Sequence, residues 1–310
     1  MIRRCTRASR WATALLLALA ALSVQGKSIE CSLSPEVHSE WQAWHSAEVQ
    51  REQGSAEGQR IDRLLACFDH PDPAIRDQWV FEGLSQLLRA GRVDAASIDR
   101  AIQRLQPVLG RPADAAGFAQ PFAALLLSEL VRADRVTPAL PAERIVSLAN
   151  DATAFLTKLR DYRAFDSEQG WRHGIAHGAD LLLQLGVHPA LNTEQQTALL
   201  MAMTDQIRNP ALAYTVGEPE RLARVVFYLH QRGDIADGIW ADWLQTLSAP
   251  APLANWGQAF QSESALRMRH NLLSFFHALS FAARQVDSES AVELLRLSDA
   301  KILRIMSGGE

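Results

Sequence analysis

Two histidines and an aspartate recur at helical spacing in the middle of the sequence. His173, His177 and Asp180 are separated by four and then three residues, which would bring their side chains to one face of a helix within two turns. Two imidazoles one turn apart can direct ring nitrogens at one divalent metal such as zinc, and a carboxylate one turn further can be a third ligand or can orient a histidine. The spacing therefore makes these three residues candidate metal ligands.

The same face has two interpretations that involve no chemistry. Histidines between packed helices often hydrogen-bond a carboxylate or carbonyl of the next helix, and the stretch has neither the glutamate of an H-E-x-x-H motif nor a clear fourth ligand. An interior hydrogen-bond network is therefore one alternative, and an exposed polar surface is another. If a metal does bind, Glu218, Glu220, His270 and His277 are candidates to complete the site, and the sequence does not select among them.

Other polar and aromatic residues near this face form a candidate ligand-binding set. An arginine beside a tyrosine can hold a carboxylate or a sugar hydroxyl, although the pair could equally clamp its loop through an Arg-Asp network. The set consists of Tyr162, Arg163, Trp171, Glu218 and Arg221.

One helix is expected to position the two histidines and the aspartate. It is predicted to begin with Asp166 or Ser167 as its N-cap and to stop at Gly186. Gly174 and Gly178 follow the histidines and weaken a helix, so we expect another backbone or a ligand to approach closely there.

Helical periodicity extends through most of the chain, and strand and hairpin signals are missing. Typical boundary residues recur, such as Gly91 as a C-terminal stop and Asp94 as an N-cap. Helices joined by short turns favour antiparallel hairpins. We therefore predict an all-α fold for residues 27–310 as a single domain, a HEAT-like α-solenoid, with an α/α-toroid as the alternative.

The N-terminus predicts secretion. Four arginines precede an apolar run over residues 12–22. This run is too short to span a bilayer, and small residues follow it up to Gly26. Residues 1–26 are predicted to be a signal peptide, with an uncleaved anchor as the alternative. The mature protein would then be periplasmic or secreted, without integral membrane association.

The charge of the mature chain limits the classes of partner that we expect it to bind. Removing residues 1–26 removes four of the 31 basic residues and none of the 35 acidic ones, which changes the net charge from −4 to −8. Binding to nucleic acid or to anionic lipid needs clustered positive charge. The sequence therefore argues against both.

Two cysteines remain after cleavage, Cys31 and Cys67. An even number in an oxidising compartment predicts a disulfide between them. The alternative is two buried thiols.

The central residues also form a longer motif: Tyr162-Arg163-x-Phe165, then Gly170-Trp171-x-His173-x-x-Ala176-His177-x-Ala179-Asp180. It resembles the motif of the bacterial family called domain of unknown function 2785, with Ala164 in place of a glycine. The likeness extends by layout over residues 69–281. It implies an α-helical, HEAT-like fold and no known activity. Family members commonly look cytosolic, so the secretion signal is a departure.

Two functions fit these observations. The first is a binding or interaction module for an unknown protein, peptide or small molecule, docking in a concavity lined by Arg163, Trp171, His173, His177 and Asp180. The second is a metal-dependent hydrolase or lyase that uses the histidine face, with Glu218 or Glu220 as general base. The sequence leaves open whether the protein is an enzyme.

Overall fold

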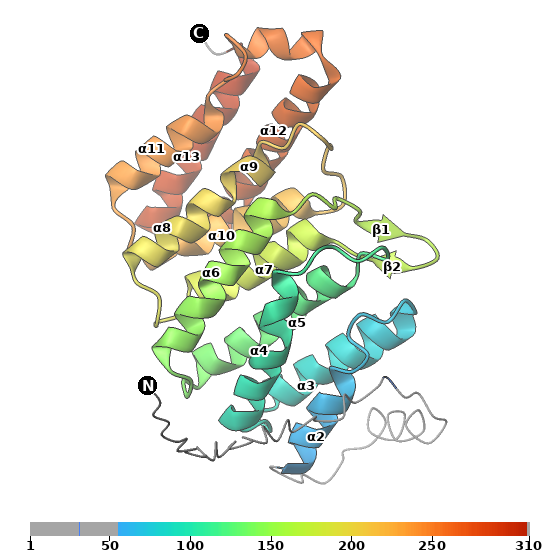
Figure 1. Ribbon diagram of the computed structural model, residues 1–310. Helices are drawn as coiled ribbons and strands as arrows, with labels where there is room; N and C mark the ends of the chain where they lie inside the picture. The colour runs from blue at the N-terminus through green and yellow to red at the C-terminus, as the bar shows by residue number, and fades with distance from the viewer. Residues whose placement is uncertain (1–30, 32–54, 309–310) are drawn as a thin grey trace, which may run out of the picture.

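A computed structural model of the chain describes residue 31 and residues 55–308, in which nearly all regular structure is helical (Figure 1). This confirms the all-α class. The elements are α2 (Ser55–Leu64), the π-helix η1 (Ala74–Glu82), α3 (Gly83–Arg89), α4 (Ala95–Leu109), α5 (Ala119–Val136), α6 (Ala142–Lys158), β1 (Phe165–Asp166), β2 (Gly170–Trp171), α7 (Gly174–Gly186), α8 (Thr193–Ala202), α9 (Thr204–Ile207), α10 (Glu218–Arg232), α11 (Asp237–Ser248), the 3-10 helix η2 (Trp256–Gln261), α12 (Glu263–Arg284) and α13 (Glu289–Met306).

Side-chain caps set several helix boundaries. Asp94 is the N-cap of α4, as predicted, and its carboxylate accepts a hydrogen bond from the backbone N–H of Ser97. Asn192 and Gln195 form a reciprocal capping box at the start of α8. Gly91, just after α3, has a φ of 65°, a left-handed conformation that glycine adopts readily. These contacts pair backbone groups that a helix end otherwise leaves without a partner.

Helices α3, α5, α7, α10 and α12 form a row in which each packs against the next. Helices α5 and α7 point the same way, because Phe122 meets His177 near their N-terminal ends and Arg135 hydrogen-bonds Gln184 near their C-terminal ends. Helix α10 shares this direction, since its first residue Glu218 lies near His173 and its last residue Arg232 bonds Gly186. Helices α4 and α6 pack against each other and against this row. In Figure 1 the helices advance in chain order from α2 and α3 at one end to α12 and α13 at the other.

The helix predicted to begin at Asp166 or Ser167 starts later, at Gly174. The residues before it form an antiparallel hairpin of β1 and β2, so the prediction of a helix here was wrong. The carboxylate of Asp166 does accept a backbone N–H, but from Gln169 at 2.8 Å inside the hairpin turn. Gly170 follows with a φ of 74°. An aspartate that caps a turn and one that caps a helix look alike in sequence.

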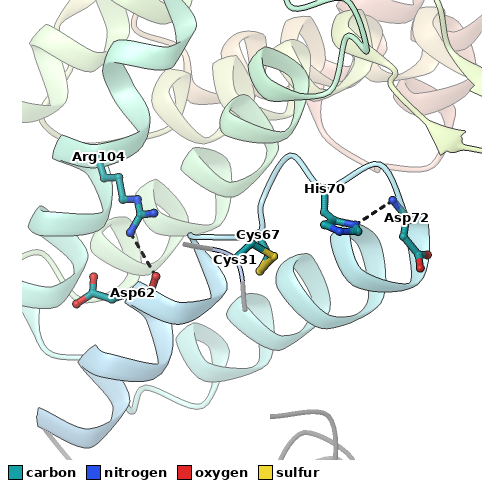
Figure 2. Close-up of a disulfide and its surroundings, with 6 residues drawn as sticks. All are labelled: Cys31, Asp62, Cys67, His70, Asp72 and Arg104. Carbon is teal, nitrogen blue, oxygen red and sulfur yellow. Dashed lines mark hydrogen bonds between the residues drawn. A yellow bond between two sulfur atoms is a disulfide. The ribbon is translucent and has the colours of Figure 1, made fainter. Parts of the chain in front are cut away.

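Cys31 and Cys67 form the predicted disulfide (Figure 2), with their Cα atoms 4.9 Å apart. The bond ties residue 31 to the segment that follows α2. Such a crosslink stabilises a fold mainly by restricting the unfolded chain. The predicted signal peptide, residues 1–26, lies outside the described residues. Within residues 55–308, no helix has the length and apolar character needed to cross a bilayer.

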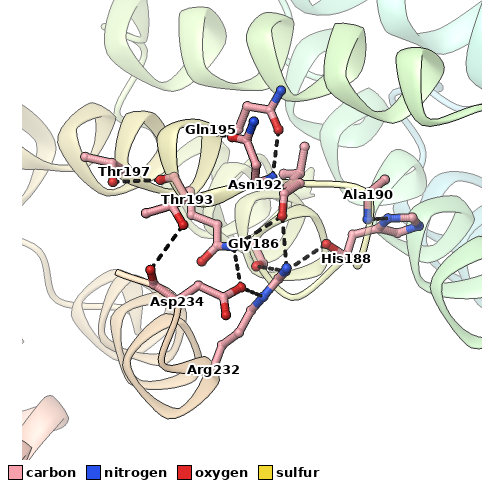
Figure 3. A network of polar contacts seen from close by, with 11 residues as sticks. Gly186, His188, Ala190, Asn192, Thr193, Gln195, Thr197, Arg232 and Asp234 are labelled. Carbon is pink, nitrogen blue, oxygen red and sulfur yellow. Dashed lines mark hydrogen bonds and ion pairs between the residues drawn. The ribbon is translucent and has the colours of Figure 1, made fainter. Parts of the chain in front are cut away.

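One arginine holds the C-terminal end of α7 (Figure 3). Nη1 of Arg232 donates to the carbonyls of Gly186 at 2.8 Å and His188 at 2.7 Å, Nη2 donates to the carbonyl of Leu191 at 2.9 Å, and Nε pairs with Asp234 at 2.6 Å. Carbonyls at and beyond a helix end have no partner within the helix. The guanidinium therefore fixes the end of α7 relative to α10.

Candidate functional site

A cleft of about 670 Å³ lies on the face formed by α5, α7 and α10. Small-molecule sites commonly occupy about 300–1,000 Å³. The cleft is lined by Asp77, Phe81, Arg89, Phe122, Leu125, Ser128, Glu129, Arg132, Trp171, His173, His177, Asp180, Leu183, Gln184, Val216, Gly217, Glu220, Arg221 and Arg224. All three predicted metal candidates, His173, His177 and Asp180, are among these residues.

His173 lies at the junction between the hairpin and α7. It is the N-cap of α7 and has a left-handed backbone, with φ 54° and ψ 41°; among the described residues no other non-glycine has a positive φ. Its ring stacks on Trp171, with centroids 4.7 Å apart. A left-handed conformation costs a non-glycine residue about 1–2 kcal/mol, so the surrounding contacts hold this histidine in an unfavourable backbone conformation.

The packing on the side of α7 that faces away from the cleft explains why residues 174 and 178 are glycines. A Cβ atom at Gly178 would lie 3.0 Å from Cδ1 of Leu156, and one at Gly174 would lie 3.1 Å from Cδ2 of Leu159. Neither glycine is part of the cleft lining. The close approach is made by side chains at the C-terminal end of α6, and not by a backbone or a ligand as predicted.

Both cleft histidines have lowered pKa values. Burial and the charge of Arg221 lower the pKa of His173 to about 4, against a hydrogen bond with the Val216 backbone that raises it. Burial, His173 and Arg221 lower the pKa of His177 to about 3, against a hydrogen bond with the Pro121 backbone. Both imidazoles are therefore neutral at pH 7.

Each cleft histidine keeps one ring nitrogen without a partner. Nε2 of His173 and Nδ1 of His177 are buried and have no hydrogen-bond partner among the described residues. A neutral imidazole has one N–H and one lone pair. The site thus holds two buried ring nitrogens whose hydrogen-bonding capacity is unused.

Glu218 lies behind His173, at the start of α10. It is 2% exposed, and its Oε2 accepts the backbone N–H of Val216 at 3.1 Å. Its Oε1 is 3.8 Å from Nε2 of His173. At this separation the two atoms form no hydrogen bond with each other. Glu220, the other predicted base, is exposed on the cleft wall.

Asp180 pairs with an arginine. Its Oδ2 is 2.5 Å from Nη1 of Arg221. Burial raises the pKa of Asp180, and the charge of Arg221 opposes that rise. Across residue 31 and residues 55–308, no group of three or more histidine, cysteine, aspartate or glutamate side chains is arranged to hold a metal ion. The three metal candidates share one cleft, and their metal role stays a prediction.

Some of the other predicted site residues line the cleft and others lie outside it. Trp171 and Arg221 line the cleft, whereas Tyr162 and Arg163 do not. Arg163 pairs with Asp161 at 2.5 Å, which is the loop network foreseen as the alternative role. The distant candidates His270 and His277 also lie outside the cleft, His270 bonding a backbone carbonyl and His277 exposed on α12.

Two arginines anchor the hairpin that carries Trp171. Arg76 is fully buried, stacks on Phe118 at 4.1 Å and donates to the carbonyl of Gln169 at 2.9 Å. Arg172 packs on the same ring at 4.5 Å. Stacking of a guanidinium on an aromatic ring is worth about 2 kcal/mol when desolvated. The hairpin is thereby fixed against the start of α5, with Trp171 at the cleft.

Sequence reasoning missed the contribution of α5. Ser128, Glu129 and Arg132 line the cleft, and Glu129 pairs with Arg89 of α3 at 2.5 Å. The signal was available, because these polar residues interrupt or follow a long apolar stretch over residues 122–127. Polar residues on a helix that is otherwise buried mark a face that does something other than fill the core.

Comparison with known proteins supports one relationship. Neither a curated protein nor a solved structure matches the chain. Residues 105–281 match the family model described as "Protein of unknown function (DUF2785)". The match spans more than half of the 310 residues and includes α5, α7 and α10, which form most of the cleft. The chain belongs to the DUF2785 family.

Proposed function

We propose that the protein is a binding module that takes a small hydroxylated molecule into the cleft. The observation that carries this proposal is the pair of buried ring nitrogens on His173 and His177 that have no partner, which we take as acceptors. More than about 90% of buried polar groups in folded proteins have a partner. Two hydroxyl groups of a ligand would pair with the two nitrogens, one each.

Electrostatics favours a neutral donor. After burial, the charge of Arg221 is among the causes that lower the pKa of both histidines, so this arginine makes a positive contribution to the potential at the two rings. A positive potential opposes an ammonium group or a metal cation and is indifferent to a neutral hydroxyl. The ligand donors that best fit the two lone pairs are therefore hydroxyl groups.

Trp171 controls access to the inner end of the cleft. The two lone-pair nitrogens are buried, while Trp171 is 38% exposed and lies between the rings of Phe165 and His173. In the proposed binding step a tilt of this ring admits the ligand hydroxyls.

The second candidate is the metal-dependent hydrolase or lyase. It is favoured by the 3.8 Å separation between Oε1 of Glu218 and Nε2 of His173, which two ligands of one metal could have. His177 would be a further ligand, and the exposed Glu220 would be the base. The ion pair of Asp180 with Arg221 argues against Asp180 as a third ligand.

Location and architecture complete the proposal. The basic and apolar N-terminus and the Cys31–Cys67 disulfide support a periplasmic or secreted protein. The row of helices from α3 to α12, in which each packs against the next, supports a HEAT-like solenoid. A concave helical row is a common binding surface in such proteins.

Native mass spectrometry and metal analysis of tag-free protein exported to the periplasm would test the proposal. We expect wild type to retain a small organic ligand, and the variant His173→Asn/His177→Gln to lose it. His277→Gln, outside the cleft, is the matched control. Less than about a tenth of an equivalent of metal is expected. One full equivalent of metal that depends on the two histidines, with no organic ligand, would instead establish the second candidate.

A further inference from the structure

We propose that the ligand of this cleft also carries an anionic group, a carboxylate, phosphate or sulfate, bound between Arg132 and Arg224. This inference rests on the proposed function and names the ligand class: a hydroxylated acid, such as a sugar acid or a sugar phosphate. Hydroxyls would meet the histidines at one end of the cleft, and the anion would meet the arginines at the other.

Two arginines that line the cleft take part in no ion pair. Arg89 pairs with Glu129, Arg221 pairs with Asp180, and Asp77 pairs with the buried Arg76. Arg132 and Arg224 line the cleft. Within residues 55–308 neither of them forms a hydrogen bond or an ion pair, and Arg224 acts on Asp180 through its charge alone.

One acidic residue is also left without a partner. Glu220 is exposed on the cleft wall, one turn before Arg224 on α10, and no ion pair joins the two. The cleft lining carries four arginines and four carboxylates, so its formal charges balance, and Arg132, Arg224 and Glu220 are the charged lining residues that form no ion pair within residues 55–308. Guanidinium groups hold carboxylate and phosphate oxygens with two parallel hydrogen bonds.

The helix row sets the distance between the histidine end and the arginine end of the cleft. Because α5, α7 and α10 point the same way, residues further along each helix lie further along the cleft. Gln184 of α7 lines the cleft seven residues beyond His177, which is about 10 Å at 1.5 Å per residue. Arg132 and Arg224 come late in the cleft-lining parts of α5 and α10. A ligand of disaccharide length would span from the histidines to the arginines.

The middle of the cleft suits the same ligand class. The Asp180–Arg221 pair stands between the two ends, with the arginine side chain 42% exposed. Such a pair can accept from one ligand hydroxyl and donate to another. Phe122 and Leu125 provide apolar contact beside it.

Calorimetric titration of wild type at low ionic strength, with matched neutral and acidic probes, tests the inference. The pairs are lactose with lactobionate, glucose with glucuronate, and glucose with glucose 6-phosphate. We expect at least one acid to bind at least about tenfold more tightly than its neutral counterpart, since a hydrogen-bonded charge contributes that much. The uronate and the phosphate distinguish the two kinds of anion.

Variants assign the effect to the two arginines. Arg132→Gln/Arg224→Gln is expected to remove the preference for the acid and to leave the affinity for the neutral probe unchanged. Arg296→Gln, which removes a surface charge on α13 outside the cleft, should keep the full preference. If wild type binds the acid and the neutral probe equally, the anionic group is ruled out while the proposed function stands. The same holds if the preference for the acid survives in the double variant. Failure of every probe to bind would contradict the proposed function itself.

Discussion

The two ends of α7 treat buried histidines in opposite ways. Just beyond its C-terminal end, His188 has a partner for each ring nitrogen: Nε2 lies 3.1 Å from Oδ2 of Asp134, and Nδ1 accepts the backbone N–H of Ala190 at 3.1 Å. At the N-terminal end, His173 and His177 each keep one nitrogen without a partner. Burial is similar at both ends. The difference is the basis of the proposal that one end serves stability and the other serves binding.

The arginines of α10 show the same contrast. Arg232 makes three hydrogen bonds to backbone carbonyls and one ion pair, whereas Arg224, two turns earlier, makes neither kind of contact among the described residues. The fold thus has a polar network that is complete at one end of the α7–α10 contact and incomplete at the cleft.

The largest expected effect is on Arg232. Arg232→Met leaves the carbonyls at the end of α7 without donors, and we expect the free energy of unfolding in urea to fall by about 2–4 kcal/mol. Arg224→Met, the matched change on the same helix, should alter it by less than about 0.5 kcal/mol. Equal losses in the two variants would erase the contrast between the two ends.

His188 should show the next largest effect. His188→Leu keeps the volume but removes the donor to Asp134, whose carboxylate is 1% exposed. Asp134 keeps the backbone N–H groups of Ala139 and Leu140, so we expect a loss of about 2–3 kcal/mol rather than more. Thermal and urea unfolding would measure it. A variant as stable as wild type would show that the pair has no structural role.

Acid should destabilise the protein through the cleft histidines. Their folded pKa values, about 4 for His173 and about 3 for His177, lie below the value of 6.5 expected when unfolded. The unfolded chain therefore binds more protons below about pH 6.5, and stability falls as pH falls. Between pH 7 and pH 5 we expect a loss of about 1–2 kcal/mol per histidine. His173→Asn/His177→Gln should flatten this part of the pH profile, and an unchanged profile would count against buried neutral rings.

Much of the fold was predictable because it depends on local patterns. Helical periodicity gave the all-α class, and Asp94 before an apolar helix gave a correct N-cap. The spacing of His173, His177 and Asp180 also brought the right three side chains to one cleft.

The remaining features depend on contacts between distant segments. The turn capped by Asp166 differs from a helix N-cap only in what the following backbone does. The pairing of Asp180 with Arg221 joins residues 41 positions apart. Arg132 and Glu129 reach the cleft only because α5 and α7 pack side by side and point the same way.

The smallest expected change tests the central claim most directly. His177→Leu replaces a buried ring that has an unpaired nitrogen with an apolar side chain of similar size. Removing an unsatisfied buried nitrogen costs little, and the Pro121 carbonyl that loses the hydrogen bond of the ring lies within α5 and keeps its helical partner. We predict that its free energy of unfolding in urea stays within about 1 kcal/mol of wild type, or rises. A loss of more than about 2 kcal/mol, as expected for His188→Leu, would contradict the claim that the cleft histidines are held for a ligand rather than for the fold.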